Sequence, residues 1–217
     1  MNRLLSLQAW LEDERPVGTV LLLDCDMVFR APVHQRSSPG APLFQWWYDL
    51  GPLSPDDPWK TAIDDLSTVS SSDMAPITWP CLIHTSDLRA IMQRWIDLTV
   101  ALREEVGSWE SDMLAFAAVF AERGVPAERT MLAAWLPWPD DVVGDAPIIH
   151  YCQPLLDEND VEVWYKYRYT PWDPIGDPGR AALGYGRDLL RIIERYARLR
   201  TIAGDVLGDD GPRRVSR

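Results

Sequence analysis

The chain is poor in the residues from which several classes of protein build their sites. It has 3 cysteines and 3 histidines among 217 residues. Three cysteines cannot form a disulfide framework, and no two of them have the CxxC spacing of a zinc site. No apolar run approaches the roughly 18 residues that a membrane helix needs. We therefore expect neither a disulfide scaffold, nor a zinc module, nor a membrane span.

Positive charge is also scarce. The chain carries 21 Lys and Arg against 33 Asp and Glu, which gives a net charge of −12. The deficit lies in residues 1–171, with 12 basic and 26 acidic side chains, whereas residues 172–217 have 9 and 7. Nucleic-acid binding needs a basic surface, so we expect no nucleic-acid partner. The acids are compatible with a metal site, although acidic side chains also simply keep a chain soluble.

The first residues lack the pattern of a signal peptide. Arg3 is the only basic residue before a short apolar stretch, and the segment turns acidic at Glu12. From this we expect a cytoplasmic protein.

Hydrophobic periodicity predicts an α/β fold in which helices flank a sheet. Expected helices are 4–14, 59–66, 87–106, 110–123 and 180–202, and expected strands are 19–24, 27–33, 81–84, 131–136 and 147–151. Ser86 is the expected N-cap of the 87–106 helix, and Gly107 its end. We interpret the rest of residues 34–79 as long loops and residues 204–217 as a disordered tail.

The most informative local feature is LLLDCDMVF, residues 21–29. An apolar run ends in Asp24 and Asp26, which is typical of a buried strand in a mostly parallel sheet. Ligands bind at the carboxyl ends of such strands, and carboxylates two residues apart project toward the same side. Carboxylate oxygens are ligands that Mg²⁺ and Mn²⁺ prefer. The alternative is a turn that carries two solvated acids.

Two enzyme classes use such a pair of acids. In haloacid-dehalogenase-like phosphatases, Asp24 would be the nucleophile and Asp26 a general acid and base. That class requires Gly and Thr soon after the pair and a second acid pair closing the metal site. Here Met27 follows, and Asp140-Asp141 lies in a segment rich in Trp and Pro. In nucleotide-sugar glycosyltransferases of the GT-A type, the pair is the DxD motif.

The order of several further segments favours the second class. They are NRLLSLQAWLE from residue 2, LIHTSDLRA from 82, GSWESDMLAF from 107, IIHYCQPL from 148, and then VWYKYRYTPW. With the DxD segment, they resemble the plant peptidyl-serine O-galactosyltransferases and hydroxyproline O-glycosyltransferases, which include arabinosyltransferases. That family has an NR helix, an LDSDM strand, an H-x-x-DLR helix, a W-x-SEM helix and a late HYG-x-P segment. The resemblance spans residues 2–172 and implies a GT-A-like mixed sheet flanked by helices.

The resemblance implies a metal and donor site. Asp26 would be the main carboxylate ligand of Mn²⁺ or Mg²⁺, and Asp24 would contact the metal or the ribose. His150 would complete the metal site; the alternative is a buried, hydrogen-bonded histidine. Lys166 would reach the diphosphate as a point charge, and its alternative is a surface lysine lying over neighbouring aromatic rings.

Acids at the start of the 110–123 helix are the candidate catalytic groups. The resemblance places Asp112 where the family has Glu, so we expect Asp112 to face the donor sugar or the acceptor hydroxyl, with Glu110 second. Their alternative role is a favourable charge in the first helical turn. His84 matches a family histidine, but we expect it to act structurally at the start of a helix.

The acceptor site has no match in the family. Residues 44–65 form an unmatched loop, so a hydroxyl-bearing acceptor, peptide or glycan, would bind around it. The tryptophans available for stacking are Trp46, Trp47, Trp59 and Trp79. Cys152 replaces a family glycine.

The resemblance also implies a partial domain. In the family, βα units that form the nucleotide pocket precede the NR helix, which here begins at residue 2. We therefore expect a GT-A-like region over residues 1–172 without its first nucleotide-binding βα units, followed by a C-terminal helix within 173–203. An exposed apolar sheet edge should remain where a partner chain could pair.

Three functional hypotheses follow from these residues. The first is a metal-dependent glycosyltransferase that moves a sugar from a UDP-sugar to a hydroxyl acceptor, with retention of anomeric configuration implied by the resemblance. A second is a non-catalytic remnant that binds a partner or a carbohydrate through tryptophan-rich loops. The third is a phosphatase with Asp24 as its nucleophile.

Overall fold

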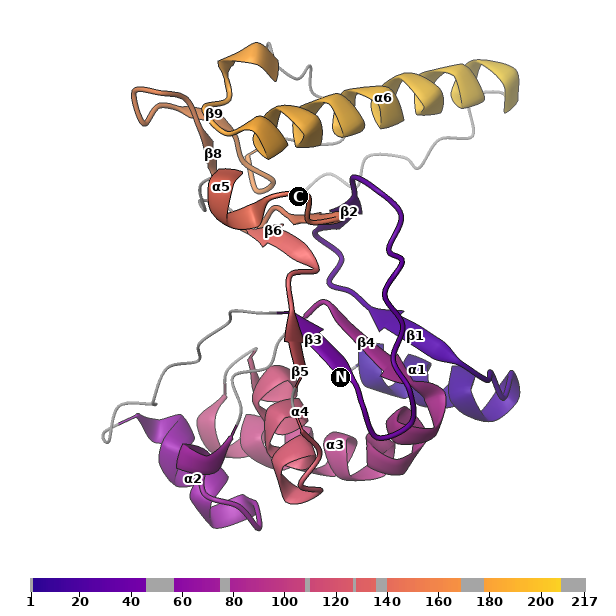
Figure 1. Ribbon diagram of the computed structural model, residues 1–217, viewed down its shortest axis with the longest axis vertical. Coiled ribbons are helices and arrows are strands. Elements are labelled where there is room, and N and C mark those ends of the chain that lie inside the picture. Colours follow the sequence, from indigo (N-terminus) through magenta and orange to yellow (C-terminus); the bar gives the residue numbers. More distant parts are fainter. Residues whose placement is uncertain are drawn as a thin grey trace. The chain divides into compact units, whose positions relative to one another are not determined.

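The computed structural model describes residues 2–45, 57–74, 79–107, 110–126, 128–135, 140–168 and 178–207 (Figure 1). It is a mixed α/β structure in which helices flank mixed sheets, as the sequence predicts. Its contacts divide the chain into two compact units. Unit 1 comprises residues 1–24 and 33–132, and unit 2 comprises residues 25–32 and 133–217. Among the described residues, no helix is long and apolar enough to cross a membrane.

Unit 1 contains a four-stranded sheet in the order β1-β4-β3-β5. The strands are β1 (Thr19–Leu22), β4 (Cys81–His84), β3 (Leu43–Gln45) and β5 (Glu128–Thr130). The central strand β4 runs antiparallel to β1 and β3, and β5 runs parallel to β3.

The expectation of a buried strand in a mostly parallel sheet is wrong for β1. Its one hydrogen-bonded neighbour within the described sheet is the antiparallel β4, and Leu22 alone among its four residues is buried. A short apolar run predicts a strand, but it does not record the direction of the neighbour, which depends on a distant segment. β1 lies at a sheet edge, and Val20 and Leu21 there are half-buried.

Two short elements occupy the segment expected to be mostly loop. α2 (Pro58–Leu66) is the helix predicted near 59–66, and the carboxylate of Asp57 caps it by accepting from the Trp59 N–H at 2.9 Å. β3 was not predicted, because three residues are too few to show a period of two. Phe44 in β3 is nevertheless fully buried. A 3₁₀ turn, η1 (Ser71–Asp73), follows α2.

Three helices complete unit 1. They are α1 (Asn2–Asp13), α3 (Thr85–Val106) and α4 (Ser111–Glu122). α3 packs against α1, α2 and α4, and Figure 1 shows α3 and α4 below the strands of the sheet. The predicted apolar face of α3 is buried, and Gly107 ends the helix with a φ of 77°, as expected. α4 is buried on all faces from Met113 to Phe120 rather than along one stripe.

Aromatic rings form the centre of unit 1. Phe116 of α4 lies 4.7 Å from Trp95 of α3, 5.0 Å from Trp79 and 4.8 Å from Phe120, measured between ring centroids. Phe44 of β3 lies 5.2 Å from Phe120 in an edge-to-face arrangement. These contacts bury large apolar areas and join the helices to the sheet.

Unit 2 contains a three-stranded sheet in the order β2-β7-β6 and a two-stranded hairpin. The elements are β2 (Met27–Phe29), β6 (Ala133–Trp135), α5 (Asp140–Val143), β7 (Ile148–His150), the hairpin strands β8 (Leu155–Leu156) and β9 (Glu162–Trp164), η2 (Pro178–Arg180) and α6 (Gly184–Leu207). β7 is antiparallel to β2 and parallel to β6. Asp140 caps α6 by accepting from the Gly184 N–H at 2.7 Å.

Some predicted boundaries differ from the observed ones. The strand expected over 131–136 corresponds to β6, and β5 just before it was not predicted. The chain passes from unit 1 to unit 2 between Leu132 and Ala133. The last helix extends to Leu207 instead of ending near 202. Of the tail predicted over residues 204–217, residues 204–207 therefore belong to this helix, and residues 208–217 lie outside the described residues.

Candidate metal centre

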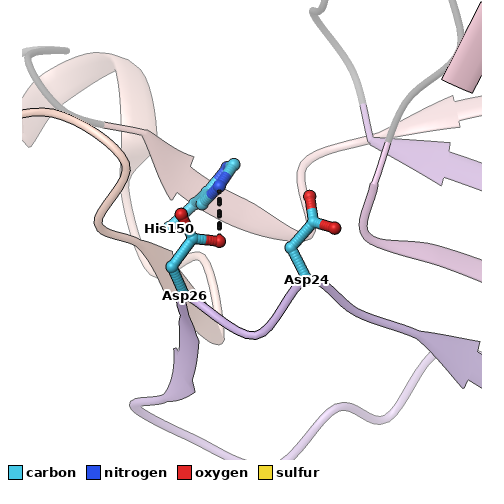
Figure 2. A group of neighbouring side chains, drawn as sticks. All are labelled: Asp24, Asp26 and His150. Carbon is cyan, nitrogen blue, oxygen red and sulfur yellow. Dashed lines mark hydrogen bonds and ion pairs between the residues drawn. The ribbon is translucent and has the colours of Figure 1, made fainter. Parts of the chain in front are cut away.

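Antiparallel pairing of β2 with β7 brings Asp26 to His150. The register places Met27 opposite His150, and the ladder continues one step further, where the Tyr151 N–H donates to the Asp26 carbonyl at 3.0 Å. Asp26 precedes the first residue of β2, and His150 is the last residue of β7. Nε2 of His150 consequently lies 3.1 Å from Oδ1 of Asp26 (Figure 2), although 124 residues separate them.

Lys166 completes this group within unit 2. It lies in the turn that follows β9, and its ammonium forms an ion pair with Oδ2 of Asp26. The Lys166 Nζ also lies 4.8 Å from the centroid of the Tyr167 ring. Lys166 thus contacts the predicted metal ligand and also lies over an aromatic ring. We call Asp26, His150 and Lys166 the unit 2 cluster.

Burial and hydrogen bonding shift the pKa values of Asp26 and Lys166 in opposite directions. Asp26 is 9% exposed and His150 is 5% exposed. Burial alone would raise the pKa of the Asp26 carboxyl, but hydrogen bonds from His150 and Lys166 outweigh it and hold that pKa well below its ordinary value. Burial lowers the pKa of Lys166, but the hydrogen bond and charge of Asp26, together with Tyr167, outweigh burial and raise that pKa overall. Asp26 is thus a carboxylate whose charge is stabilised by donors.

Tyr151 borders the same group. Its ring lies 5.6 Å from that of Trp164 in β9, and its hydroxyl donates to the Cys25 carbonyl at 3.4 Å. Burial and the negative charge of Asp26 raise the pKa of Tyr151, which keeps it a neutral donor. The hydroxyl therefore helps to fix the peptide between the two acids.

Asp24 belongs to a different set of contacts. It is the last residue of the first segment of unit 1, and its Oδ1 accepts from Nη1 of Arg3 in α1 at 2.5 Å. Nη2 of the same guanidinium forms an ion pair with Asp112 in α4. We call Arg3, Asp24 and Asp112 the unit 1 cluster. Arg3 thereby joins two of the residues that the sequence singles out.

The surroundings of the unit 1 cluster fix its members. The Arg3 guanidinium lies 5.0 Å from the centroid of the Trp79 ring. Burial lowers the pKa of Arg3, but the charges of Asp112 and Asp24 outweigh this and keep the guanidinium positive. Nε1 of Trp95 donates to the Asp112 carbonyl at 2.7 Å, so the first turn of α4 is anchored to the aromatic core.

The two carboxylates and the imidazole are close enough to bind one ion. One ligand atom from each of Asp24, Asp26 and His150 lies within 4.8 Å of the others (Figure 2). A single residue separates the two acids in the sequence, so the local chain brings their carboxylates near one another. Two oxygen donors and one imidazole nitrogen suit Mn²⁺ better than Mg²⁺, which prefers oxygen ligands alone.

The other predicted residues have structural positions. Glu110 is the N-cap residue of α4, and its carbonyl accepts from the N–H groups of Met113 and Leu114 at 3.0 Å each. His84 is the N-cap of α3, where its ring accepts from the Ser86 N–H at 3.3 Å. The expectation that His84 acts at the helix start is confirmed, and the expectation that Ser86 is the N-cap is wrong.

The expected acceptor surface is only partly described. Trp46, Trp47 and residues 48–56 lie outside the described residues. Trp79 is 3% exposed and stacks on Phe116, so it belongs to the core and cannot stack on an acceptor. Its burial follows from packing between α3 and α4, which its own sequence neighbourhood of Thr, Pro and Cys does not indicate.

Sequence reasoning missed Arg3. It lies in the quoted NR segment, but its contacts with Asp24 and Asp112 span 21 and 109 residues. The one local signal is an arginine in the first turn of a helix, where a cation is unfavourable unless acids lie near it.

Neither comparison with known proteins identifies the chain. No model of a known protein family matches it, and a search of curated proteins gives no significant match.

Proposed function

We propose that this chain is a metal-dependent glycosyltransferase that transfers a sugar from a UDP-sugar to a hydroxyl acceptor with retention of configuration. One observation carries the metal part of the proposal, namely the meeting of Asp26 with His150 beside Asp24. The sugar-transfer part is supported by the ordered motifs between residues 2 and 172, which include these three residues.

The donor set fits a divalent cation. Asp26 and His150 would hold it, and Asp24, two residues from Asp26, would supply the third ligand. Lys166 and Arg3 now neutralise the two acids, so the ion would take over part of the role of these internal cations. A bound Mn²⁺ would supply positive charge that stabilises the departing diphosphate.

Two further side chains support transfer rather than storage of a metal. Lys166 bears a positive charge beside Asp26, where it would attract the diphosphate as a point charge. Asp112 is held by Arg3 and by the Trp95 contact to its carbonyl, so its carboxylate has a defined position from which to face the donor sugar or the acceptor hydroxyl.

The test is UDP binding by isothermal titration calorimetry, with and without Mn²⁺, on the wild type and two variants. Asp26→Asn keeps the shape of the side chain and removes its charge. Asp13→Asn, at the exposed end of α1, removes the same charge elsewhere and is the matched control. We expect UDP binding that requires Mn²⁺, is lost in Asp26→Asn and is retained in Asp13→Asn.

Other results would select the alternatives. A wild type that is folded by circular dichroism and binds no UDP with Mn²⁺ contradicts the transferase and favours a remnant that binds a partner or carbohydrate. Metal-dependent hydrolysis of p-nitrophenyl phosphate that disappears in Asp24→Asn would instead establish the phosphatase.

A further inference from the structure

The guanidinium of Arg3 already occupies a cation position at Asp24. Its two terminal nitrogens are divided between two acids, Nη1 for Asp24 and Nη2 for Asp112. This forked geometry is one that arginine provides and lysine does not. The first carboxylate of the DxD pair is thus engaged before any metal arrives.

The contact is anchored on the arginine side. Arg3 lies in the first turn of α1, and its guanidinium lies over the Trp79 ring, which is itself buried in the core. The helix is fixed at its other apolar positions, because Leu4 and Leu11 are buried. The fixed helix and the Trp79 ring therefore hold the guanidinium near Asp24.

The positive charge of Arg3 should weaken the binding of a divalent cation at Asp24. Asp24, Asp112 and Arg3 together carry one negative charge, and without the arginine the same two acids would carry two. A divalent cation is attracted more strongly by the second arrangement. Arg3 also uses one Asp24 oxygen as a hydrogen-bond acceptor, so a metal must displace or share that contact.

We propose that Arg3 is an internal competitor of the metal, which pairs with Asp24 and so sets the affinity of the site for divalent cations. This inference rests on the proposed metal site. Arg3 acts through Asp24 and does not itself bind the metal, so it is a positioning residue. A site weakened in this way would bind its metal firmly only when a further anionic ligand, such as the diphosphate, adds negative charge.

The experiment measures Mn²⁺ binding alone by isothermal titration calorimetry. Arg3→Gln removes the charge, Arg3→Lys keeps it without the fork, and Arg15→Gln removes an exposed arginine just after α1 as the control. We expect Arg3→Gln to bind Mn²⁺ on the order of tenfold more tightly, as loss of one positive charge several ångströms from a dication predicts. Arg3→Lys should lie between the two, and Arg15→Gln should match the wild type.

A second background shows whether Arg3 acts through Asp24. The Asp24→Asn variant lacks the carboxylate that Arg3 pairs with. Adding Arg3→Gln to it should therefore increase the affinity for Mn²⁺ much less than the same change does in the wild type. Thermal melts of every variant report folding, and Arg3→Lys carries the comparison if Arg3→Gln does not fold.

The outcomes separate the two proposals. Mn²⁺ binding that is unchanged or weaker in Arg3→Gln overturns the competitor role and leaves the metal site standing. Binding by Arg3→Gln but not by the wild type supports it in its strongest form. If neither protein binds Mn²⁺, the proposed metal function fails and the role of Arg3 fails with it.

Discussion

The two acids on either side of Cys25 have different surroundings. Asp24 lies in the unit 1 cluster, where one arginine is shared between two carboxylates and the side chain is 23% exposed. Asp26 lies in the unit 2 cluster, where one carboxylate receives both a lysine and a histidine and the side chain is 12% exposed. The first cluster keeps one uncompensated negative charge, whereas the carboxylate of the second is fully paired.

This difference shows that neighbours in the sequence need not share an environment. Asp24 is paired with Arg3 of α1, which also pairs with Asp112 of α4, whereas the partners of Asp26 come from β7 and the turn after β9. Each acid therefore has its own partner cation within its own unit. A substitution in one unit or one cluster should therefore change stability or metal binding in a way that a substitution in the other does not.

The largest expected effect is on the core of unit 1. Phe116→Ala removes the ring that contacts Trp79, Trp95 and Phe120, and we expect a loss of about 4 kcal/mol in the free energy of unfolding. Cys81 is fully buried in unit 1 and Cys25 is exposed in unit 2, so the thiols report on the units separately. Mass spectrometry after pulsed alkylation should show faster labelling of Cys81 and unchanged labelling of Cys25. Equal protection of Cys81 in both proteins would show that the core tolerates the cavity.

The next effect compares the two acids directly. We expect Asp26→Asn to weaken Mn²⁺ binding by about 100-fold and Asp24→Asn by about tenfold, because Asp26 is the more buried carboxylate and lies in contact with His150, the other candidate ligand. Calorimetric titration of the two variants under identical conditions measures the ratio. Equal losses would show that the two carboxylates are equivalent ligands and that the clusters do not differ in function.

A third change affects unit 2 alone. A Cβ on Gly186 in α6 would lie 2.4 Å from Cδ1 of the fully buried Leu155 in β8. Alanine normally favours a helix over glycine, but this overlap reverses the sign, and we expect Gly186→Ala to cost about 2 kcal/mol. Chemical denaturation followed by circular dichroism measures it. Combining it with Leu155→Val should recover part of the loss, and a stabilised single variant would contradict the observed packing.

The smallest effect concerns a salt bridge distant from both clusters. Glu122 receives Nη2 of Arg94 at 2.6 Å and Nε of Arg94 at 3.0 Å, and these bonds, opposed by burial, lower its pKa below the ordinary 4.5. At about pH 7, Glu122→Gln should cost about 1 kcal/mol through loss of a charged hydrogen-bond acceptor. A carboxyl with a lowered pKa in the folded state stabilises the fold above its unfolded pKa. That stabilisation is lost as the pH falls through the folded value.

The measurement is the urea midpoint of wild type and Glu122→Gln at neutral and acidic pH. The gap between the two proteins should narrow as the pH falls from the ordinary 4.5 toward the lowered folded-state pKa of Glu122, and close once the wild-type glutamate is protonated in both states. A gap that is constant with pH would mean that shape, not charge, explains the loss. Glu104→Gln, an exposed glutamate on α3, is the matched control and should leave the urea midpoint at neutral pH unchanged.

Strong periodicity made most helices predictable. The 87–106 segment has apolar residues on one face from Leu88 to Leu102, about four turns, so the burial of this face could be predicted residue by residue. The short strands were harder, because β3 and β5 have three residues each and their partners lie far along the chain. The antiparallel edge position of β1 could not be deduced from its own four residues, since they carry no information on the direction of β4.

The candidate site also has parts that the sequence predicts and parts that it does not. Asp24 and Asp26 are recognisable because a strand-like run ends in two acids, and His150 and Lys166 were picked out only through the resemblance. The division of the acids between two sets of cations was not predictable. Arg3 meets Asp112 across 109 residues, and no local pattern records such a contact.

By itself, the sequence determined an acidic α/β chain with well-marked helices and a DxD pair following an apolar strand. These properties depend on interactions within a few residues, namely helical periodicity, caps and the alternation of a strand. Only the tertiary structure decided that His150 and Lys166 converge on Asp26 while Arg3 holds Asp24. The physical reason is that ion pairs and imidazole contacts depend on a few ångströms of three-dimensional separation, which strand register and helix packing set and which spacing along the chain does not.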